Sequence, residues 1–271
     1  MQHEIIQAGN LLHTDGSLAQ KGWAKDLLLT YKRSAIKASV FKIKEWDYYC
    51  ILNNEYGIAL TVADNSYMAL YAINVFDFKQ NTEITDRVIV PFTMGKLQMP
   101  EHSAHGDITI QHKKIQLQFK HVKGKRVLDF NFPTFNKGNG IKGHIELDVL
   151  NKDSMVIATP WKEDKTAFYY NQKINCLAAT GEFIFRDKKY SFTPDKATGV
   201  LDWGRGVWTY KNRWYWGSAS GYINGKPFGF NIGYGFGDTS AASENILFYN
   251  GVAHKLDDVK FIINKKNYMQ P

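Results

Sequence analysis

Short runs of alternating apolar and polar residues, joined by turns rich in Asn, Asp and Gly, extend along most of the chain. Three such runs follow one another between residues 47 and 78, and hairpin-like runs resume from Asp107. Alternation with a period of two is typical of a strand with one buried face. No amphipathic helical stripe of useful length interrupts these runs. The pattern therefore predicts an all-β, antiparallel fold.

Many short strands joined by hairpins avoid open edges by closing into barrels. At 271 residues, the chain is long enough for one large β domain or two small ones. We expect a first β-barrel in residues 1–195 and a second in residues 196–271, beginning just before the strand-like run GVLDWGRG. The run Val259 to Ile263 is followed only by NKKNYMQP, so the second barrel is expected to be incomplete.

The stretch from Leu201 to Asp238 is unusual in composition. It holds four of the seven Trp, and together with Gly199 it holds ten of the 22 Gly. Large rings that alternate with bare backbone favour a sheet surface that something approaches closely. An alternative interpretation is purely structural, because aromatic rings laid over glycines also stabilise a strand pair.

The register of this stretch follows from Asn224-Gly225, a strong signal for a two-residue type I′ hairpin. This turn places Ser218 opposite Asn231, and Trp216 opposite Gly233. One face of the hairpin then carries Trp214, Trp216, Ser218, Ser220 and Asn231. The other face carries Tyr215, Ala219, Phe228, Phe230, Ile232 and Tyr234 and is expected to be ordinary core.

A weaker turn at Lys211-Asn212 is expected to pair the preceding strand in the same way. Trp203 and Arg205 would then join Trp216 on one surface and form a pocket wall for a ligand. A buried guanidinium needs a carboxylate, a stacked ring or a ligand as its partner. The structural alternative is a salt bridge between Arg205 and Asp202.

Asp202 is the candidate catalytic acid, with Arg205 as its counterpart. Burial among tryptophans would raise the pKa of Asp202 and keep a proton available, whereas direct pairing with Arg205 would lower it. Asp238 and Glu244 bracket a loop of small residues, and one of them is expected to reach Arg205 or the cavity mouth. The alternative is an Asx-turn at Asp238 and a solvated Glu244.

Several runs identify a family resemblance: LDWGRGVW, WYWGSASG, GFNIGYGFGD, SENILFYNG, KEWDYY, ATPWK and YYNQKINC. With these runs the chain resembles the domain of unknown function 2804 family over nearly its whole length. It is more distantly similar to the carotenoid 1,2-hydratase, AttH and tocopherol cyclase group. That resemblance implies two lipocalin-like (calycin) barrels and a substrate of isoprenoid or lipid-like character. The Gly-x-Trp of lipocalins is missing, since Gly22 and Trp23 are adjacent.

Composition excludes several other classes. The net charge of +8 comes from scattered lysines rather than a dense stripe with arginine, so we expect no nucleic-acid partner. Two cysteines, Cys50 and Cys176, indicate buried thiols and not a disulfide framework. With no signal peptide and no membrane-length apolar run, a cytoplasmic protein without an integral membrane segment is expected.

The chemistry-bearing motifs point away from cofactors. There is no P-loop, dinucleotide fingerprint, nucleophile elbow, HExxH or CxxC, so we expect no cofactor. The cluster Glu101, His102, His105 and Asp107 is interpreted as a polar loop, and no metal is expected.

Three function classes remain. The first is a cofactor-independent hydratase, cyclase or isomerase that acts on a hydrophobic isoprenoid, polyketide or lipid-like molecule. The second is a non-catalytic carrier of such a molecule. The third, a carbohydrate-binding β module, requires Trp214 and Trp216 to form an exposed flat strip.

Overall fold

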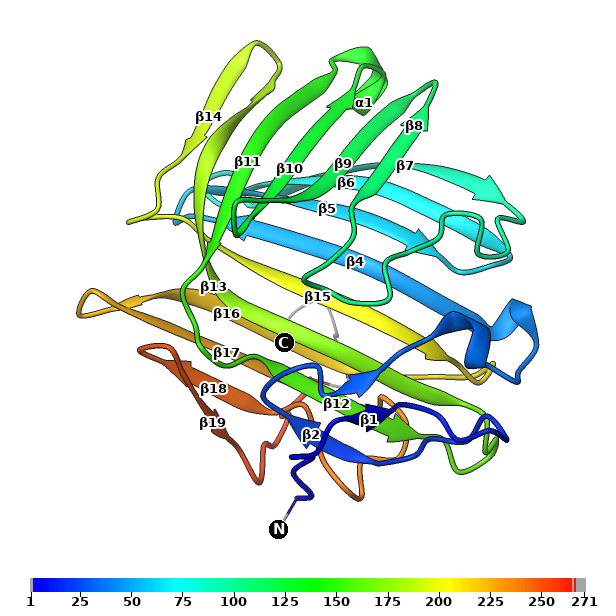
Figure 1. Cartoon of the computed structure of the whole chain (residues 1–271). Coiled ribbons are helices and arrows are strands. Elements are labelled where there is room, and N and C mark those ends of the chain that lie inside the picture. Colours follow the sequence, from blue (N-terminus) through cyan, green and yellow to red (C-terminus); the bar gives the residue numbers. More distant parts are fainter. Residues whose placement is uncertain (1, 265, 267–271) are drawn as a thin grey trace.

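The computed structural model describes residues 2–264 and residue 266, which form three β-sheets and very little helix (Figure 1). The prediction of an all-β, antiparallel fold is confirmed; the short pair β1 (Gly9–Asn10) and β3 (Leu29–Thr30) is parallel. Among the described residues, no helix is long and apolar enough to cross a membrane.

The large sheet has thirteen strands, ten of them in the order β7-β6-β5-β4-β15-β13-β11-β10-β9-β8. One flank and the centre are β4 (Ile43–Leu52), β5 (Tyr56–Asp64), β6 (Met68–Asp77), β7 (Thr82–Pro91), β13 (Phe168–Phe185) and β15 (Thr198–Val207). The other flank is β8 (Ile108–His112), β9 (Ile115–Val122), β10 (Lys125–Phe132) and β11 (Ile141–Val149). The strands β2 (Gly22–Ala24), β12 (Met155–Pro160) and β14 (Lys188–Phe192) pair off this path.

Strand β13 gives the large sheet its curl. Its first part pairs with β12 and β15, and its second part pairs with β11 and β14. Between these parts the register shifts, and Cys176 has a φ of 59°. A β-bulge bends its strand and increases the local twist. The sheet therefore curls into a half-barrel, in which Tyr49 of β4 packs against Phe119 of β9 at 5.1 Å between ring centroids.

Strand β15 lies inside the large sheet, between β4 and β13. The predicted pairing of this strand with residues 215–223 is wrong, and Lys211-Asn212 lies in the crossover from one sheet to the other. Alternation fixes which residues share a face but not which strand they pair with, and distant partners compete with near ones. The strand that follows residue 195 is thus flanked on both sides by strands that precede it.

A second sheet follows the crossover. It contains β16 (Tyr215–Ile223), β17 (Lys226–Tyr234), β18 (Ile246–Tyr249) and β19 (Val252–Lys255). Its inner face packs on β13 and β15 (Figure 1). On its outer face Tyr215 stacks on Tyr234, which is 42% exposed. The prediction that this outer face is ordinary core is therefore wrong, because its aromatic residues are only partly covered.

Three short helical segments complete the described chain. They are the 3₁₀ turns η1 (Arg33–Ala35) and η2 (Val40–Lys42) and the short turn α1 (Phe135–Gly138). The first two precede β4 and thus lead into the centre of the large sheet.

Candidate functional site

The hairpin between β16 and β17 has the predicted register. Ser218 pairs with Asn231, and Trp216 pairs with Gly233. Asn224 and Gly225 have φ values of 51° and 72°, as a type I′ turn requires. The alternation along β16 therefore turns Trp216 toward the large sheet.

An aromatic cleft of about 490 Å³ lies between the two sheets, and we call it the tryptophan cleft. Its aromatic and acidic lining comprises Trp46, Tyr67, Asp202, Trp208, Tyr210, Trp214, Trp216 and Phe236. Trp208 is central to it, because its ring centroid is 5.7 Å from that of Trp46 and 5.3 Å from that of Trp214. A cleft of this size can hold one small molecule.

Glycine does lie beneath an aromatic ring in this site, at Gly204. The indole of Trp46 covers Gly204 so closely that an added Cβ would lie 2.0 Å from a ring carbon. Gly233 lies opposite Trp216 as predicted, but the group that covers it is the Glu244 carboxylate and not an aromatic ring. A Cβ added at Gly233 would lie 2.1 Å from an oxygen of that carboxylate.

We expect Gly204→Ala to lower the free energy of unfolding by about 1–3 kcal/mol, the usual range for overpacking, because the Trp46 ring must move. Urea denaturation measures this loss. Gly221→Ala in β16 is the matched control, because an added Cβ there meets no atom within 4 Å. Equal losses of unfolding free energy in the two variants would contradict the conclusion that the Trp46 ring packs directly against Gly204.

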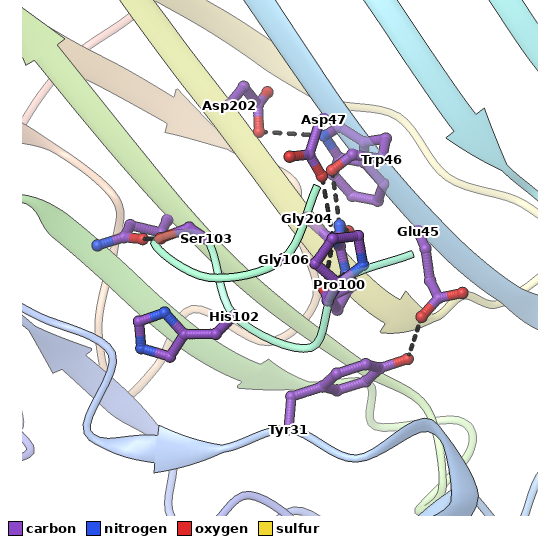
Figure 2. Close-up of polar contacts among 12 residues, drawn as sticks. Tyr31, Glu45, Trp46, Asp47, Pro100, His102, Ser103, Gly106, Asp202 and Gly204 are labelled. Atoms are coloured by element: carbon purple, nitrogen blue, oxygen red, sulfur yellow. Dashed lines mark hydrogen bonds and ion pairs between the residues drawn. The ribbon is translucent and has the colours of Figure 1, made fainter. Parts of the chain in front are cut away.

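Asp202 projects from β15 to the floor of the cleft, and three side chains bind it. Trp46 Nε1 and Asn171 Nδ2 donate to Oδ1 at 3.1 Å and 2.7 Å, and Figure 2 shows the first of these bonds. Lys173 Nζ lies 2.6 Å from Oδ2, and its side chain is 1% exposed. Lys173 and Asp202 therefore form an ion pair at the floor of the cleft.

Lys173 connects Asp202 with a second buried carboxyl group. Its Nζ lies 3.5 Å from the hydroxyl of Tyr169, which in turn donates to Glu244 Oε2 at 3.4 Å. Burial raises the pKa of Glu244 to about 7, although the positive charge of Lys173 opposes this shift. Two carboxyl groups with different environments are the arrangement that separates an acid from a base.

The polar residues of β16 and β17 have defined partners. Asn231 accepts a hydrogen bond from Trp216 Nε1 at 2.7 Å and donates one to the carbonyl of Glu244 at 2.9 Å. Asn175 donates to the hydroxyl groups of Ser218 and Ser220 at 2.9 Å and 3.3 Å. The two Asn175 hydrogen bonds connect β16 of the second sheet to β13 of the large sheet.

Arg205 lies on the opposite face of β15 from Asp202, so the prediction that it joins Trp216 in one cavity is wrong. An unbroken strand alternates its side chains, and Trp203, which packs against the guanidinium, is turned away from the cleft as well. Arg205 pairs with Asp47 at 3.0 Å and donates to the Pro100 carbonyl at 2.7 Å. The structural alternative, a salt bridge between Arg205 and Asp202, is wrong too, because the partner of Arg205 is Asp47. In Figure 2, Pro100 lies beside Asp47 and Gly204, on a loop that covers this face.

Neither acidic residue of the loop before β18 reaches Arg205. Asp238 accepts a hydrogen bond from Ser240 N at 3.0 Å, as the Asx-turn alternative predicted, and lies 3.9 Å from Lys162. Glu244 is 1% exposed, so the alternative of a solvated side chain is wrong.

The sequence did not single out Lys173, Tyr169, Asn171 or Trp46. The first three alternate along the run YYNQKIN and so share one face of β13, but this run of polar residues does not mark Lys173 as buried. Within the described residues, no group of three His, Cys, Asp or Glu side chains converges as a metal ion would require.

Comparisons with known proteins place the chain in a family. Among curated proteins no relative matches. Two similar solved structures share 10% identity with it: a protein assigned as AttH from Nitrosomonas europaea, and kievitone hydratase from Nectria haematococca. The first alignment covers 83% of this chain and 71% of the other, with a TM-score of 0.47. The second covers 78% and 63%, with a TM-score of 0.41. Since the model of the domain of unknown function DUF2804 matches residues 2–271, this protein is a member of that family.

Proposed function

We propose that the tryptophan cleft binds a hydrophobic small molecule of isoprenoid, polyketide or lipid-like character and acts on it as a hydratase, cyclase or isomerase without a cofactor. One observation carries this proposal. Asp202 lies at the floor of an aromatic cleft and is connected through Lys173 and Tyr169 to Glu244, a carboxyl group that holds a proton near neutral pH.

Within this set of residues, Asp202 is the one that meets the ligand, because its side chain is 15% exposed and lines the cleft, whereas Lys173 and Glu244 are each 1% exposed. Glu244 serves as the proton store behind it. Lys173 transfers a proton to Asp202 and regains one from Glu244 through the hydroxyl of Tyr169. Asp202 then passes its proton to a carbon of a ligand double bond. The faces of Trp46 and Trp216 stabilise the resulting cation. In a hydration, water then bonds to the cationic carbon and returns its proton to Asp202.

We expect Asp202→Asn to abolish turnover, because an amide can neither deliver nor recover this proton. Mass spectrometry of small molecules that co-purify with each protein tests the expectation and requires no candidate substrate. An unreacted precursor should accumulate on the variant, and its product should appear on the wild type. Asp238→Asn is the matched control, since Asp238 lies outside the cleft lining.

A non-catalytic carrier is the second candidate function. It is favoured by the full set of partners around Asp202, because Trp46, Asn171 and Lys173 leave this carboxylate little freedom to exchange a proton. Identical bound molecules on the wild type and on Asp202→Asn, with no turnover by either, would favour it. A carbohydrate-binding module is less well supported, because Trp214 and Trp216 line a cleft together with Trp208.

A further inference from the structure

A second hollow of about 190 Å³ lies between the two sheets, on the other side of Trp216 from the tryptophan cleft. Tyr48 and Cys50 of β4 line it from the large sheet, and Ser218 and Ser220 line it from β16. Trp216 lines both spaces and therefore stands between them. At about 30 Å³ for each small group, the hollow has room for roughly six methylene groups.

Trp216 is held in place from three directions. Its Nε1 donates to Asn231 at 2.7 Å, and Asn231 is itself fully buried. Lys173 Nζ lies 4.9 Å from the ring centroid, as in a cation–π contact, and Tyr48 meets the ring edge-on at 6.3 Å. A tryptophan fixed by a hydrogen bond, a cation and a second ring does not rotate freely out of the way.

We infer that Trp216 is a partition that closes the hollow against molecules in the cleft and so limits the length of the ligand. The ligand is then a compact, ring-sized apolar molecule and not a long chain. The part of this inference that concerns the ligand rests on the proposed function, because it takes the tryptophan cleft as the binding site. The partition itself is a property of the chain and is testable without a ligand.

The rate at which a thiol reagent labels Cys50 reports access to the hollow. Its half-buried side chain lines the space, and desolvation raises the pKa of its thiol to about 11, so little of the reactive thiolate is present at neutral pH. The other cysteine, Cys176, is 0% exposed and is not part of this lining. Labelling of Cys176 therefore reports general unfolding, and labelling of Cys50 alone reports opening of the hollow.

The test uses N-ethylmaleimide at pH 8, followed by peptide mass mapping of both cysteines over time. Trp216→Ala should increase the labelling rate of Cys50 severalfold, because the hollow then opens into the cleft and the half-buried thiol is reached from that side as well. Trp214→Ala is the matched control: Trp214 lines the cleft but not the hollow, and its loss should leave the rate unchanged. Equal Cys50 rates in Trp216→Ala and the wild type would overturn the inference.

A milder variant keeps the test decisive if Trp216→Ala unfolds and labels Cys176 as well. Trp216→Phe keeps an aromatic ring but loses the bond to Asn231, and a smaller rise in the Cys50 rate is expected; no rise would overturn the inference. The Cys50 rates need neither a ligand nor turnover, so they support or overturn the partition whether or not the proposed function holds.

Discussion

Replacing Arg205 by methionine is expected to lower the free energy of unfolding by about 3–5 kcal/mol, the usual cost of breaking a buried ion pair from one side. Arg205 is 0% exposed and supplies the hydrogen bonds of Asp47, of the Trp46 carbonyl and of the Pro100 carbonyl. Methionine fills much of the same volume but leaves these acceptors without their donor. Equilibrium urea denaturation gives the loss directly.

The double variant Arg205→Met with Asp47→Asn should recover part of this loss, because the unpaired buried charge is removed. Arg87→Met on β7 is the matched control, since Arg87 is exposed and its loss should cost less than about 0.5 kcal/mol. A cost at Arg205 as small as that at Arg87 would show that the pair with Asp47 does not anchor the centre of the sheet.

Replacing Glu244 by glutamine is expected to stabilise the protein above neutral pH. Burial raises the pKa of Glu244 from 4.5 to about 7. The folded protein therefore holds a proton that the unfolded chain has lost between these pH values. As a result, the free energy of unfolding falls as pH rises from 4.5 to about 7 and is level above that. Glutamine imitates the neutral carboxyl group and avoids this loss, which amounts to about 3 kcal/mol.

Urea denaturation of both proteins at several pH values tests this expectation. The advantage of Glu244→Gln should be largest at pH 8 and should shrink to nothing below pH 4.5. The exposed Glu163 supplies the control, because Glu163→Gln should show no such pH-dependent advantage. An advantage for Glu244→Gln that does not vary with pH would mean that the Glu244 carboxyl group has the same pKa in the folded and unfolded protein.

The β16–β17 hairpin was predictable because its information is local. Asn224-Gly225 sets the turn, and the period of two then fixes every partner from Ile223 back to Tyr215. The place of β15 was not predictable in the same way, since Thr198 pairs with Leu52 across a long stretch of chain. Alternation puts Asp202 and Arg205 on opposite faces of this strand, but no local pattern shows that β4 and β13 flank it, so the sequence analysis assigned Arg205 to the face of Trp216.

The candidate site was predicted in part for the same reason. Trp214, Trp216 and Asn231 follow from the hairpin, and Asp202 follows from its position in a strand rich in glycine and tryptophan. Lys173 and Glu244 come from two other segments, and they meet because the two sheets stack on each other. A buried lysine has no local signature, since its partner is fixed by tertiary packing and not by spacing in the sequence.

The position of β15 also determines when the large sheet can be completed during synthesis on the ribosome. The meander β4 to β7 and the strands β8 to β13 are all synthesised before residue 198 emerges, yet β4 and β13 are joined only by β15. A nascent chain that ends at residue 195 therefore holds two unjoined groups of strands with unpaired edges. Such edges invite misassociation, and late long-range pairing is slow. Closure of the large sheet must wait for its last strand, which is also the strand that carries Asp202.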